Sequence, residues 1–143
     1  MAVSALQTAA MQTDHPVSPA IRIFVVENSP AIRERLIVLL AAVPGAIIQG
    51  YAERAAEAID LILEQKPDAV VLDLNLTEGS GLHVLRVLQD VAPEIAVFVL
   101  TNYADAQYRR LCTRLGARGF FDKSTEFEKV RDAIAALAMQ PVP

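Results

Sequence analysis

Short apolar runs alternate along the chain with longer stretches in which apolar residues follow helical spacing. The apolar runs cover residues 21–26, 46–49, 69–72, 95–100 and 119–121. They are rich in β-branched and aromatic residues and do not alternate with polar positions, which is typical of strands buried on both faces. The pattern therefore predicts five strands at the centre of a layered domain.

The intervening stretches carry apolar residues every three or four positions, as a helix packed on a core requires. The predicted buried stripes are Ile32, Leu36, Leu39 and Val43; Ala55, Ile59 and Ile62; Ala104, Tyr108, Leu111 and Leu115; and Phe127, Val130, Ile134 and Leu137. Helix ends are expected at Pro44-Gly45, Pro67, Pro93 and Gly116. Thr125 and Glu128 predict a capping box for the last helix.

Strands that alternate with helices indicate an open parallel sheet covered on both faces, which is a doubly wound α/β fold. The commonest order for five such strands is 2-1-3-4-5, the flavodoxin-like topology. We expect one domain over residues 21–139. Residues 1–20, rich in Ala, Ser, Thr and Gln, are interpreted as a flexible extension, and residues 140–143 as a disordered tail.

Composition narrows the classes of function. The formal net charge of −4 does not indicate a basic surface for nucleic acid, so no direct nucleic-acid binding is expected. A single cysteine excludes an internal disulfide, and the two histidines lie far apart in the sequence. No apolar run approaches the ~20 residues of a membrane span, so we expect a cytoplasmic protein without membrane contact.

Polar residues follow the apolar runs at the edge where ligands bind in doubly wound sheets. They are Glu27, Asn28, Asp73, Thr101, Asn102, Asp122 and Lys123. Such a set could hold Mg²⁺ through oxygen ligands, present an aspartate nucleophile to a phosphoryl group, or form a buried ion pair without chemistry. An ammonium and a hydroxyl suit phosphate oxygens, so Lys123 and Thr101 favour the phosphoryl interpretation.

Four segments in order resemble the receiver domain of two-component response regulators, over about residues 21–137. They are Val25-Val26-Glu27-Asn28, Val70-Val71-Leu72-Asp73-Leu74-Asn75 with Gly81, Leu100-Thr101, and Gly119-Phe120-Phe121-Asp122-Lys123. Each segment is a weak signal by itself. Together, at the expected spacing, the four segments are specific.

The resemblance implies a role for each matching residue. Asp73 would accept a phosphoryl group from a histidine kinase or a phosphotransfer protein, and Lys123 would bind a phosphate oxygen. Thr101 and Phe120 would be the switch residues that respond to phosphorylation. Mg²⁺ would be held by the residues Glu27, Asn28 and Asp73 and by the backbone carbonyl of Asn75.

Several positions depart from the family pattern. Asn28 stands where receivers usually carry a metal-binding Asp, so Mg²⁺ should bind weakly; the alternative for Asn28 is a helix N-cap. Asn102 replaces a small residue and is expected to narrow the route to Asp73. Phe120 lacks the hydroxyl of the tyrosine that is commoner in the family. Thr77 and Ser124 stand where receivers frequently carry proline.

The leading hypothesis is a stand-alone receiver, because only four residues follow the last predicted helix. It would catalyse only its own phosphorylation and dephosphorylation and signal to a protein partner or a second copy of itself. The expected output surface is the face formed by the fourth helix, fifth strand and fifth helix. The alternative is a pseudo-receiver that acts as a protein-interaction module without phosphorylation, for which Asn28 and Asn102 are the motivation. A hydrolase and a flavin-binding module are less favoured.

Overall fold

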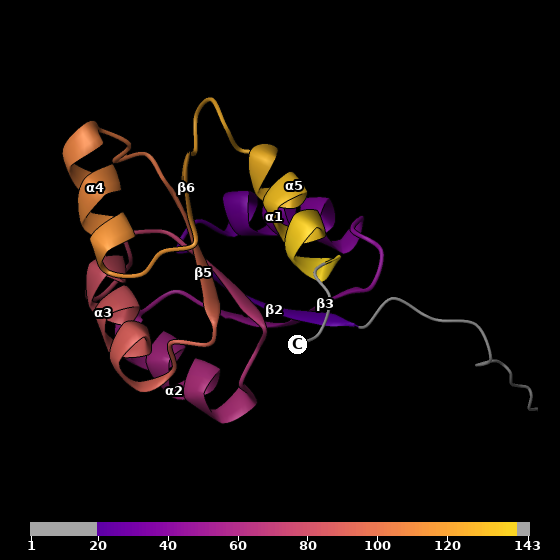
Figure 1. Ribbon diagram of the computed structural model, residues 1–143, viewed down its shortest axis with the longest axis horizontal. Helices are drawn as coiled ribbons and strands as arrows, with labels where there is room; N and C mark the ends of the chain where they lie inside the picture. Colours follow the sequence, from indigo (N-terminus) through magenta and orange to yellow (C-terminus); the bar gives the residue numbers. More distant parts are fainter. Residues whose placement is uncertain (1–19, 140–143) are drawn as a thin grey trace, which may run out of the picture.

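The structure is a computed structural model that describes residues 20–139. Within these residues, strands and helices alternate strictly along the chain (Figure 1). The elements are β2 (Ile21–Val26), α1 (Pro30–Ala41), β3 (Ala46–Ala52), α2 (Ala55–Gln65), β4 (Ala69–Leu72), α3 (Gly81–Val91), β5 (Ala96–Thr101), α4 (Ala106–Arg114), β6 (Gly119–Asp122) and α5 (Lys129–Ala138).

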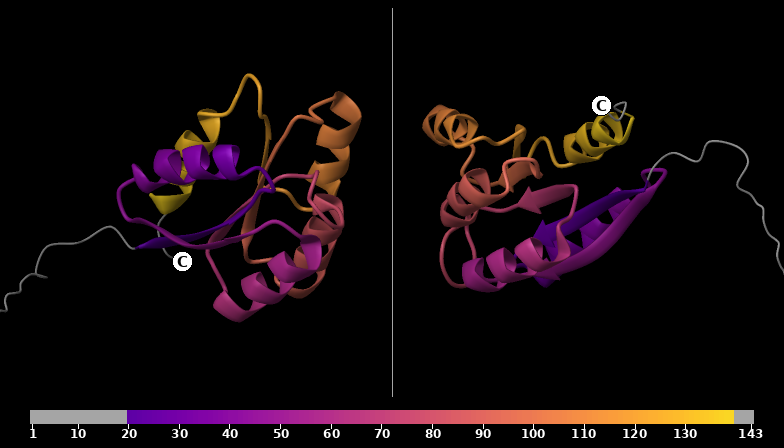
Figure 2. Two further views of the ribbon diagram at one scale, coloured as in Figure 1. Left: turned by 180° about the vertical axis from the view of Figure 1, so that it is seen from behind. Right: turned by 60° about the horizontal axis from the view of Figure 1, so that its bottom comes forward.

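The five strands form one parallel sheet in the order β3-β2-β4-β5-β6. Counted along the chain this is 2-1-3-4-5, so the predicted doubly wound topology is confirmed. Helices α1 and α5 cover one face of the sheet, and α2, α3 and α4 cover the other (Figures 1 and 2). After β2 the chain continues to β3 at one edge of the sheet, and after β4 it continues to β5 on the other side. The two connections therefore diverge between β2 and β4, which creates the switch point where ligands bind.

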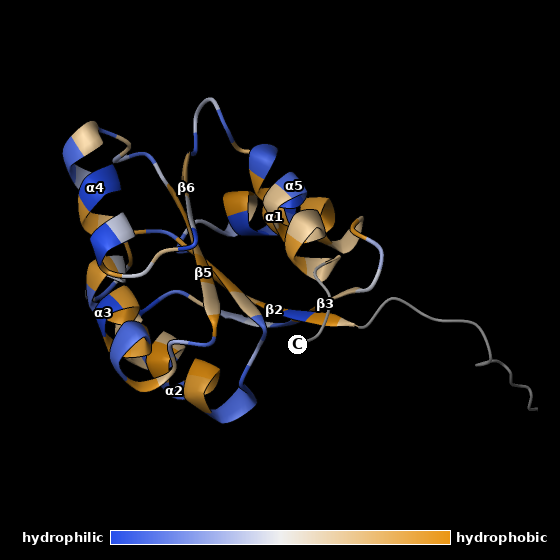
Figure 3. Ribbon diagram, viewed as in Figure 1, coloured by the Kyte–Doolittle hydropathy of each residue, from blue (hydrophilic) through white to orange (hydrophobic). Residues whose placement is uncertain are grey.

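Two apolar layers hold the helices to the sheet. Along β2, Phe24 and Val26 pack toward α2 and α3, whereas Ile23 and Val25 pack toward α1 and α5. Every residue of β4 and β5 is buried, as the absence of alternation predicted. The helices turn apolar surface toward the sheet and polar surface outward (Figure 3).

Strand β3 extends three residues beyond the predicted end and continues to Ala52. Its register with β2 shifts between Ile23 and Phe24, which is a bulge on the β3 side. Gly50 lies at this shift, and a Cβ there would be only 3.2 Å from the ring of Phe24. The glycine that weakens the strand signal in the sequence therefore allows the strand to continue past the bulge.

Helix starts and stripes differ in detail from the prediction. The prediction of a capping box at Thr125 and Glu128 is wrong. Helix α5 begins at Lys129, its N-cap is Glu128, and no side-chain hydrogen bond caps it. Phe127 lies outside the helix but is buried with Val130 on the α1–α5 side. In α1, Leu40 is fully buried where Leu39 was predicted. Cys112 is buried in the layer of α2, α3 and α4, and burial raises the pKa of its thiol to about 11.

The predicted extension at residues 1–20 and tail at residues 140–143 fall, apart from residue 20, outside the described residues. Among the described residues, no helix is both long enough and apolar enough to cross a membrane.

Candidate functional site

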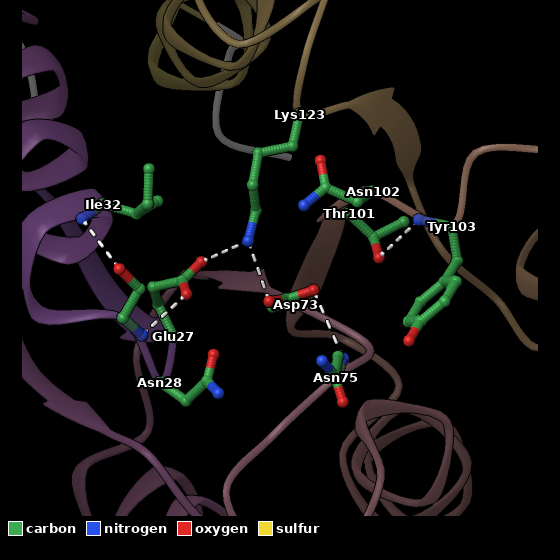
Figure 4. Close-up of a pocket in the computed structure, with 10 residues that line it drawn as sticks. Glu27, Asn28, Ile32, Asp73, Asn75, Thr101, Asn102, Tyr103 and Lys123 are labelled. Atoms are coloured by element: carbon green, nitrogen blue, oxygen red, sulfur yellow. Dashed lines mark hydrogen bonds and ion pairs between the residues drawn. The ribbon is translucent and has the colours of Figure 1, made fainter.

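A pocket of about 520 Å³ opens at the carboxyl ends of β2, β4 and β5 (Figure 4). The structure brings most of the predicted residues to it. Its lining consists of Glu27, Asn28, Ser29, Ile32, Asp73, Asn75, Thr101, Asn102, Tyr103 and Lys123. The sheet thus collects side chains from four loops that are far apart in the sequence.

Lys123 lies at the centre of this pocket. Its Nζ donates to Asp73 Oδ2 and to Glu27 Oε1, at 2.8 Å in each case. Glu27 is 2% and Asp73 5% exposed. Burial alone would lower the pKa of Lys123, but the hydrogen bonds and charges of Asp73 and Glu27 outweigh it and raise that pKa. The ammonium therefore stays charged between two buried carboxylates.

The β2–α1 loop fixes the direction of Glu27. The backbone N–H of Ser29 donates to Glu27 Oε2 at 2.9 Å. Ser29 is also the N-cap of α1, since its hydroxyl accepts from the N–H of Ile32, and Pro30 occupies the first helical position. The alternative that Asn28 caps this helix is therefore wrong. The Asn28 side chain lies in the pocket lining instead (Figure 4).

The loop after β4 holds Asp73 close to the sheet. The N–H of Asp73 donates to the carbonyl of Val26 at 3.0 Å, which continues the ladder between β2 and β4. Asp73 Oδ1 accepts from the N–H of Asn75 at 3.3 Å. At Gly81, a Cβ would collide with the carbonyl oxygen of Asp73, so the return of the loop into α3 requires glycine.

The opposite wall of the pocket comes from β5 and β6. Thr101 is fully buried, its Oγ1 accepts from the N–H of Tyr103 at 3.2 Å, and its carbonyl accepts from the N–H of Lys123 at 2.9 Å. Asn102 lines the pocket, as its predicted place on the route to Asp73 requires. The half-exposed ring of Tyr103 lies beside Tyr108, with 5.8 Å between ring centroids.

Phe120 lies in the core behind this wall. It is 7% exposed and packs with the α2–α4 layer. The Arg109 guanidinium, on α4, lies 4.8 Å from the centroid of the Phe120 ring and donates to the Phe120 carbonyl at 3.0 Å. Arg109 also lies 3.5 Å from Glu126, whose carboxylate accepts from the N–H of Asp122. The ring of Phe120 thus already points inward in this structure.

Asp122 does not reach the pocket, contrary to the prediction. Its carboxylate accepts from the hydroxyl of Ser124 at 2.6 Å and from the Ser124 N–H at 2.9 Å. These hydrogen bonds hold the pKa of Asp122 below its usual value, with the Ser124 side chain as the largest cause. Asp122 therefore stabilises the turn that follows β6.

The donor set fits a hard divalent cation. Two buried carboxylates, Glu27 and Asp73, face the same space as the amide of Asn28 and the residue Asn75. Magnesium prefers such oxygen ligands and takes few of them from protein, keeping waters for the rest. No group of three or more acidic, histidine or cysteine side chains gathers within residues 20–139, so the site offers at most two acidic ligands.

Three residues that line the pocket were not predicted from the sequence: Ser29, Ile32 and Tyr103. Ser29 could have been found, because a Ser before Pro30 is a strong N-cap signal that places it beside the first strand end. Tyr103 follows Thr101 by two residues, and its position depends on the course of the β5–α4 loop. Nothing in the local sequence indicates that course.

Comparison with known proteins defines the class to which this fold and site belong. Residues 23–135 match the family described as the response regulator receiver domain. The match covers well over half of the chain. The chain therefore belongs to the response regulator receiver family.

Individual relatives agree with this assignment. The response regulator MprA of Mycolicibacterium vanbaalenii is 32% identical over 127 residues, which are 86% of this chain and 52% of that protein. The DNA-binding transcriptional activator DevR/DosR of Mycobacterium tuberculosis is 28% identical over 114 residues, 80% of this chain and 52% of that protein. The chain spans about half the length of the curated relatives it matches.

Among solved structures, the response regulator domain of Thermotoga maritima CheB is similar, with a TM-score of 0.73 and 25% identity. The similarity covers 87% of this chain and 99% of that domain. The shared fold therefore extends over essentially all of the described residues.

Proposed function

We propose that this receiver accepts one phosphoryl group on Asp73 from the phosphohistidine of a histidine kinase or a phosphotransfer protein. The observation that carries the proposal is Lys123, whose ammonium lies 2.8 Å from a carboxylate oxygen of Asp73 at the base of an open pocket. An aspartate can serve as a covalent nucleophile when its environment stabilises the developing charge. Interaction of receivers with kinases and downstream partners is typical of the family.

In the proposed step, a carboxylate oxygen of Asp73 attacks the phosphorus while the phosphorus–nitrogen bond breaks. The bonding pair leaves with the imidazole, which takes up a proton from water. The charge on the transferred group sits on its equatorial oxygens, and a fixed ammonium stabilises this charge without reorganising. Lys123 supplies that ammonium and keeps Glu27 as its second partner throughout.

Mg²⁺ binding at the phosphorylation site is also typical of the family. In our proposal Glu27, Asn28, Asp73 and the carbonyl of Asn75 hold the ion. When bound, it neutralises charge on the phosphoryl oxygens. The neutral amide of Asn28 contributes less attraction than a carboxylate, so we propose weak binding.

The direct test is incubation with a small phosphodonor, with and without Mg²⁺, followed by intact-mass measurement. The proposal expects a gain of one phosphoryl group that is faster with Mg²⁺. Absence of uptake from every donor would reject it in favour of the pseudo-receiver, a phosphorylation-independent interaction module.

Restoring an acid at position 28 is expected to strengthen Mg²⁺ binding. In Asn28→Asp, a charge joins the proposed ligand set in a partly buried pocket, and we expect affinity to rise about tenfold. The metal-free variant should be less stable, because three carboxylates then repel one another around one ammonium. Calorimetric titration and thermal unfolding measure the two effects.

The matched control for this prediction is Asn102→Asp, which adds the same charge to the opposite wall of the pocket. Equal gains in the two variants would show that general electrostatics, and not ligation by position 28, sets the affinity.

We propose that the signal leaves through the face formed by α4, β6 and α5. Thr101 ends the strand that leads into α4, and Phe120 lies on β6, so a change at Asp73 reaches this face first. On α4, Arg110 and Arg114 are exposed and four residues apart. Basic side chains here could pair across a two-fold axis with the acids Asp122, Glu128 and Asp132 of a second copy, or with a charged partner.

Reversing charge on this face is expected to weaken self-association or partner binding while phosphorylation of Asp73 continues. The variant is Arg110→Glu with Arg114→Glu, measured by sedimentation with and without phosphodonor. Lys66→Glu with Arg86→Glu, which changes net charge equally on the α2–α3 side, is the control. If the α4 pair associates as the parent does, the output surface lies elsewhere and α1 is the next candidate.

Two finer expectations complete the proposal. The receiver turns over no external substrate, and it acts in the cytoplasm. Assay of phosphate-ester hydrolysis tests the first. The location of the native protein, measured by immunoblotting of fractionated cells, tests the second.

A further inference from the structure

Arg33, in the first turn of α1, contacts Glu27 after β2, the ring of Tyr51 in β3 and Glu53 in the loop after β3. Its Nη1 donates to the Glu27 carbonyl at 3.1 Å and to Glu53 Oε2 at 2.8 Å. Its guanidinium also lies 4.2 Å from the centroid of the Tyr51 ring. The Arg33 side chain is only 13% exposed, so these contacts are shielded from solvent more than an ordinary surface ion pair.

The bond to the Glu27 carbonyl has a direct geometric consequence for the pocket. That carbonyl belongs to the same planar peptide unit as the N–H of Asn28. The hydrogen bond from Arg33 therefore fixes the orientation of the peptide plane that lies between the side chains of Glu27 and Asn28. Both side chains lie on one side of the pocket, opposite Thr101 and Tyr103 (Figure 4).

The bond to Glu53 extends this support to the loop that carries Asp73 and Asn75. The backbone carbonyl of Glu53 accepts from the N–H of Thr77 at 3.1 Å. One residue further, the Glu78 carbonyl accepts from the N–H of Ala55 at 2.9 Å. The β3–α2 loop is therefore joined on one side to the β4–α3 loop by backbone bonds and on the other to α1 by Arg33.

We infer that Arg33 is a positioning residue for the phosphorylation site. It holds the Glu27–Asn28 peptide in place and, through Glu53, fixes the position of the β4–α3 loop relative to that peptide. The inference rests on the proposed function for its consequence, since Glu27 and Asn28 are proposed Mg²⁺ ligands. A lysine would not reproduce all three contacts of Arg33, because its ammonium has no planar face to place against the Tyr51 ring while it reaches the two oxygens.

The test compares Arg33→Ala with Arg35→Ala. Arg35 is on the same helix and stacks on Phe127, in the β6–α5 loop, with 4.2 Å to the ring centroid. Among the described residues, it makes no hydrogen bond or ion pair with the loops that Arg33 joins. Both variants thus lose an arginine–aromatic contact of α1, and only Arg33→Ala loses the link between the Glu27 carbonyl and Glu53. Arg33→Lys adds a variant that keeps the charge.

Two readouts are measured: the Mg²⁺ dissociation constant by calorimetry, and amide hydrogen exchange at Ser29 and Thr77. We expect Arg33→Ala to weaken Mg²⁺ binding about tenfold and to speed exchange at both amides, with Arg33→Lys recovering only part of either effect. In Arg35→Ala, both readouts should stay as in the parent, whatever its change in melting temperature.

Equal effects of the two alanine variants would overturn the inference, because Arg33 would then contribute only to general stability. If the parent shows no Mg²⁺ binding, the exchange readout decides alone, and unchanged exchange at Ser29 and Thr77 in Arg33→Ala overturns it. Absence of phosphoryl uptake by the parent would reject the proposed function and leave both of these readouts intact.

Discussion

Replacing Asp73 by alanine is expected to abolish phosphoryl uptake completely. Asp73 is the one carboxylate in the pocket that combines a lysine partner with a place at the end of the central strand β4. Glu27 shares Lys123, but its other oxygen is held more closely, at 2.9 Å from the Ser29 N–H, than Asp73 Oδ1 is, at 3.3 Å from the Asn75 N–H. An alanine removes the attacking oxygen, so neither Mg²⁺ nor the phosphodonor concentration should restore labelling.

The variant should remain folded, which keeps the result interpretable. In Asp73→Ala, Lys123 retains Glu27 at 2.8 Å, so no buried ammonium is left without a partner. The backbone bond from position 73 to the carbonyl of Val26 is independent of the side chain. Circular dichroism and thermal unfolding should therefore show a native fold.

Intact-mass measurement after treatment with a phosphodonor checks this prediction. Asp90→Ala, which removes an exposed acid on α3, is the control and should label like the parent. Labelling of Asp73→Ala at the parent level would place the acceptor elsewhere. Asp122, next to Lys123 in the sequence, would then be the first residue to examine.

The sequence predicted the sheet and most of the pocket because both follow from local patterns and one general rule. Each apolar run is a strand, and in parallel sheets the residues after the strands meet at one edge. Glu27 and Lys123 are 96 residues apart in the sequence and yet are hydrogen-bonded, as that rule implies.

Asp122 shows where the rule fails. At other strand ends two successive residues, such as Thr101 and Asn102, both line the pocket, whereas after β6 only Lys123 does. The longer side chain of Lys123 reaches the carboxylates, and Asp122 turns to Ser124 instead. Proximity in sequence to a strand end is therefore not sufficient, because the direction of the side chain decides whether it enters the pocket.

The supporting arginines could not be predicted from sequence. Arg33 and Arg109 stand on helices with ordinary charged surfaces, where the default interpretation of an arginine is solvated charge. Their partners, Glu53 and the carbonyl of Phe120, are identified only when the helices are placed against the sheet. Such contacts depend on the docking of whole elements, about which a local pattern contains no information.

Replacing Lys123 by methionine is expected to reduce both stability and phosphorylation. Methionine fills a similar volume without the ammonium, which leaves Asp73 and Glu27 buried and facing each other with no cation between them. Breaking a buried ion pair by removal of one partner typically costs about 3–5 kcal/mol, because the remaining charge stays desolvated. Loss of a fixed donor to a developing oxyanion lowers a rate by about 10²–10³-fold, and we expect a similar loss of phosphorylation.

The contribution of Lys123 to stability should depend on pH in a defined direction. Asp73 and Glu27 raise the pKa of Lys123 above its ordinary value of 10.5, despite the opposing effect of burial. A group whose pKa is higher in the folded state stabilises fully below its unfolded pKa, and the contribution is lost as pH rises through the folded value. The difference in unfolding free energy between parent and Lys123→Met should therefore be constant from neutral pH to about pH 10 and shrink above it.

Urea unfolding at several pH values measures this difference, and the rate of mass gain from a phosphodonor measures the catalytic loss. Lys129→Met is the matched control, because Lys129 is a 63% exposed lysine that pairs with Glu126 at 3.4 Å. An exposed pair of that kind contributes about 0–1 kcal/mol, so this variant should unfold and phosphorylate nearly as the parent does. If Lys123→Met matched Lys129→Met in both measurements, the ammonium between Asp73 and Glu27 would be an ordinary ion pair without a part in phosphoryl transfer.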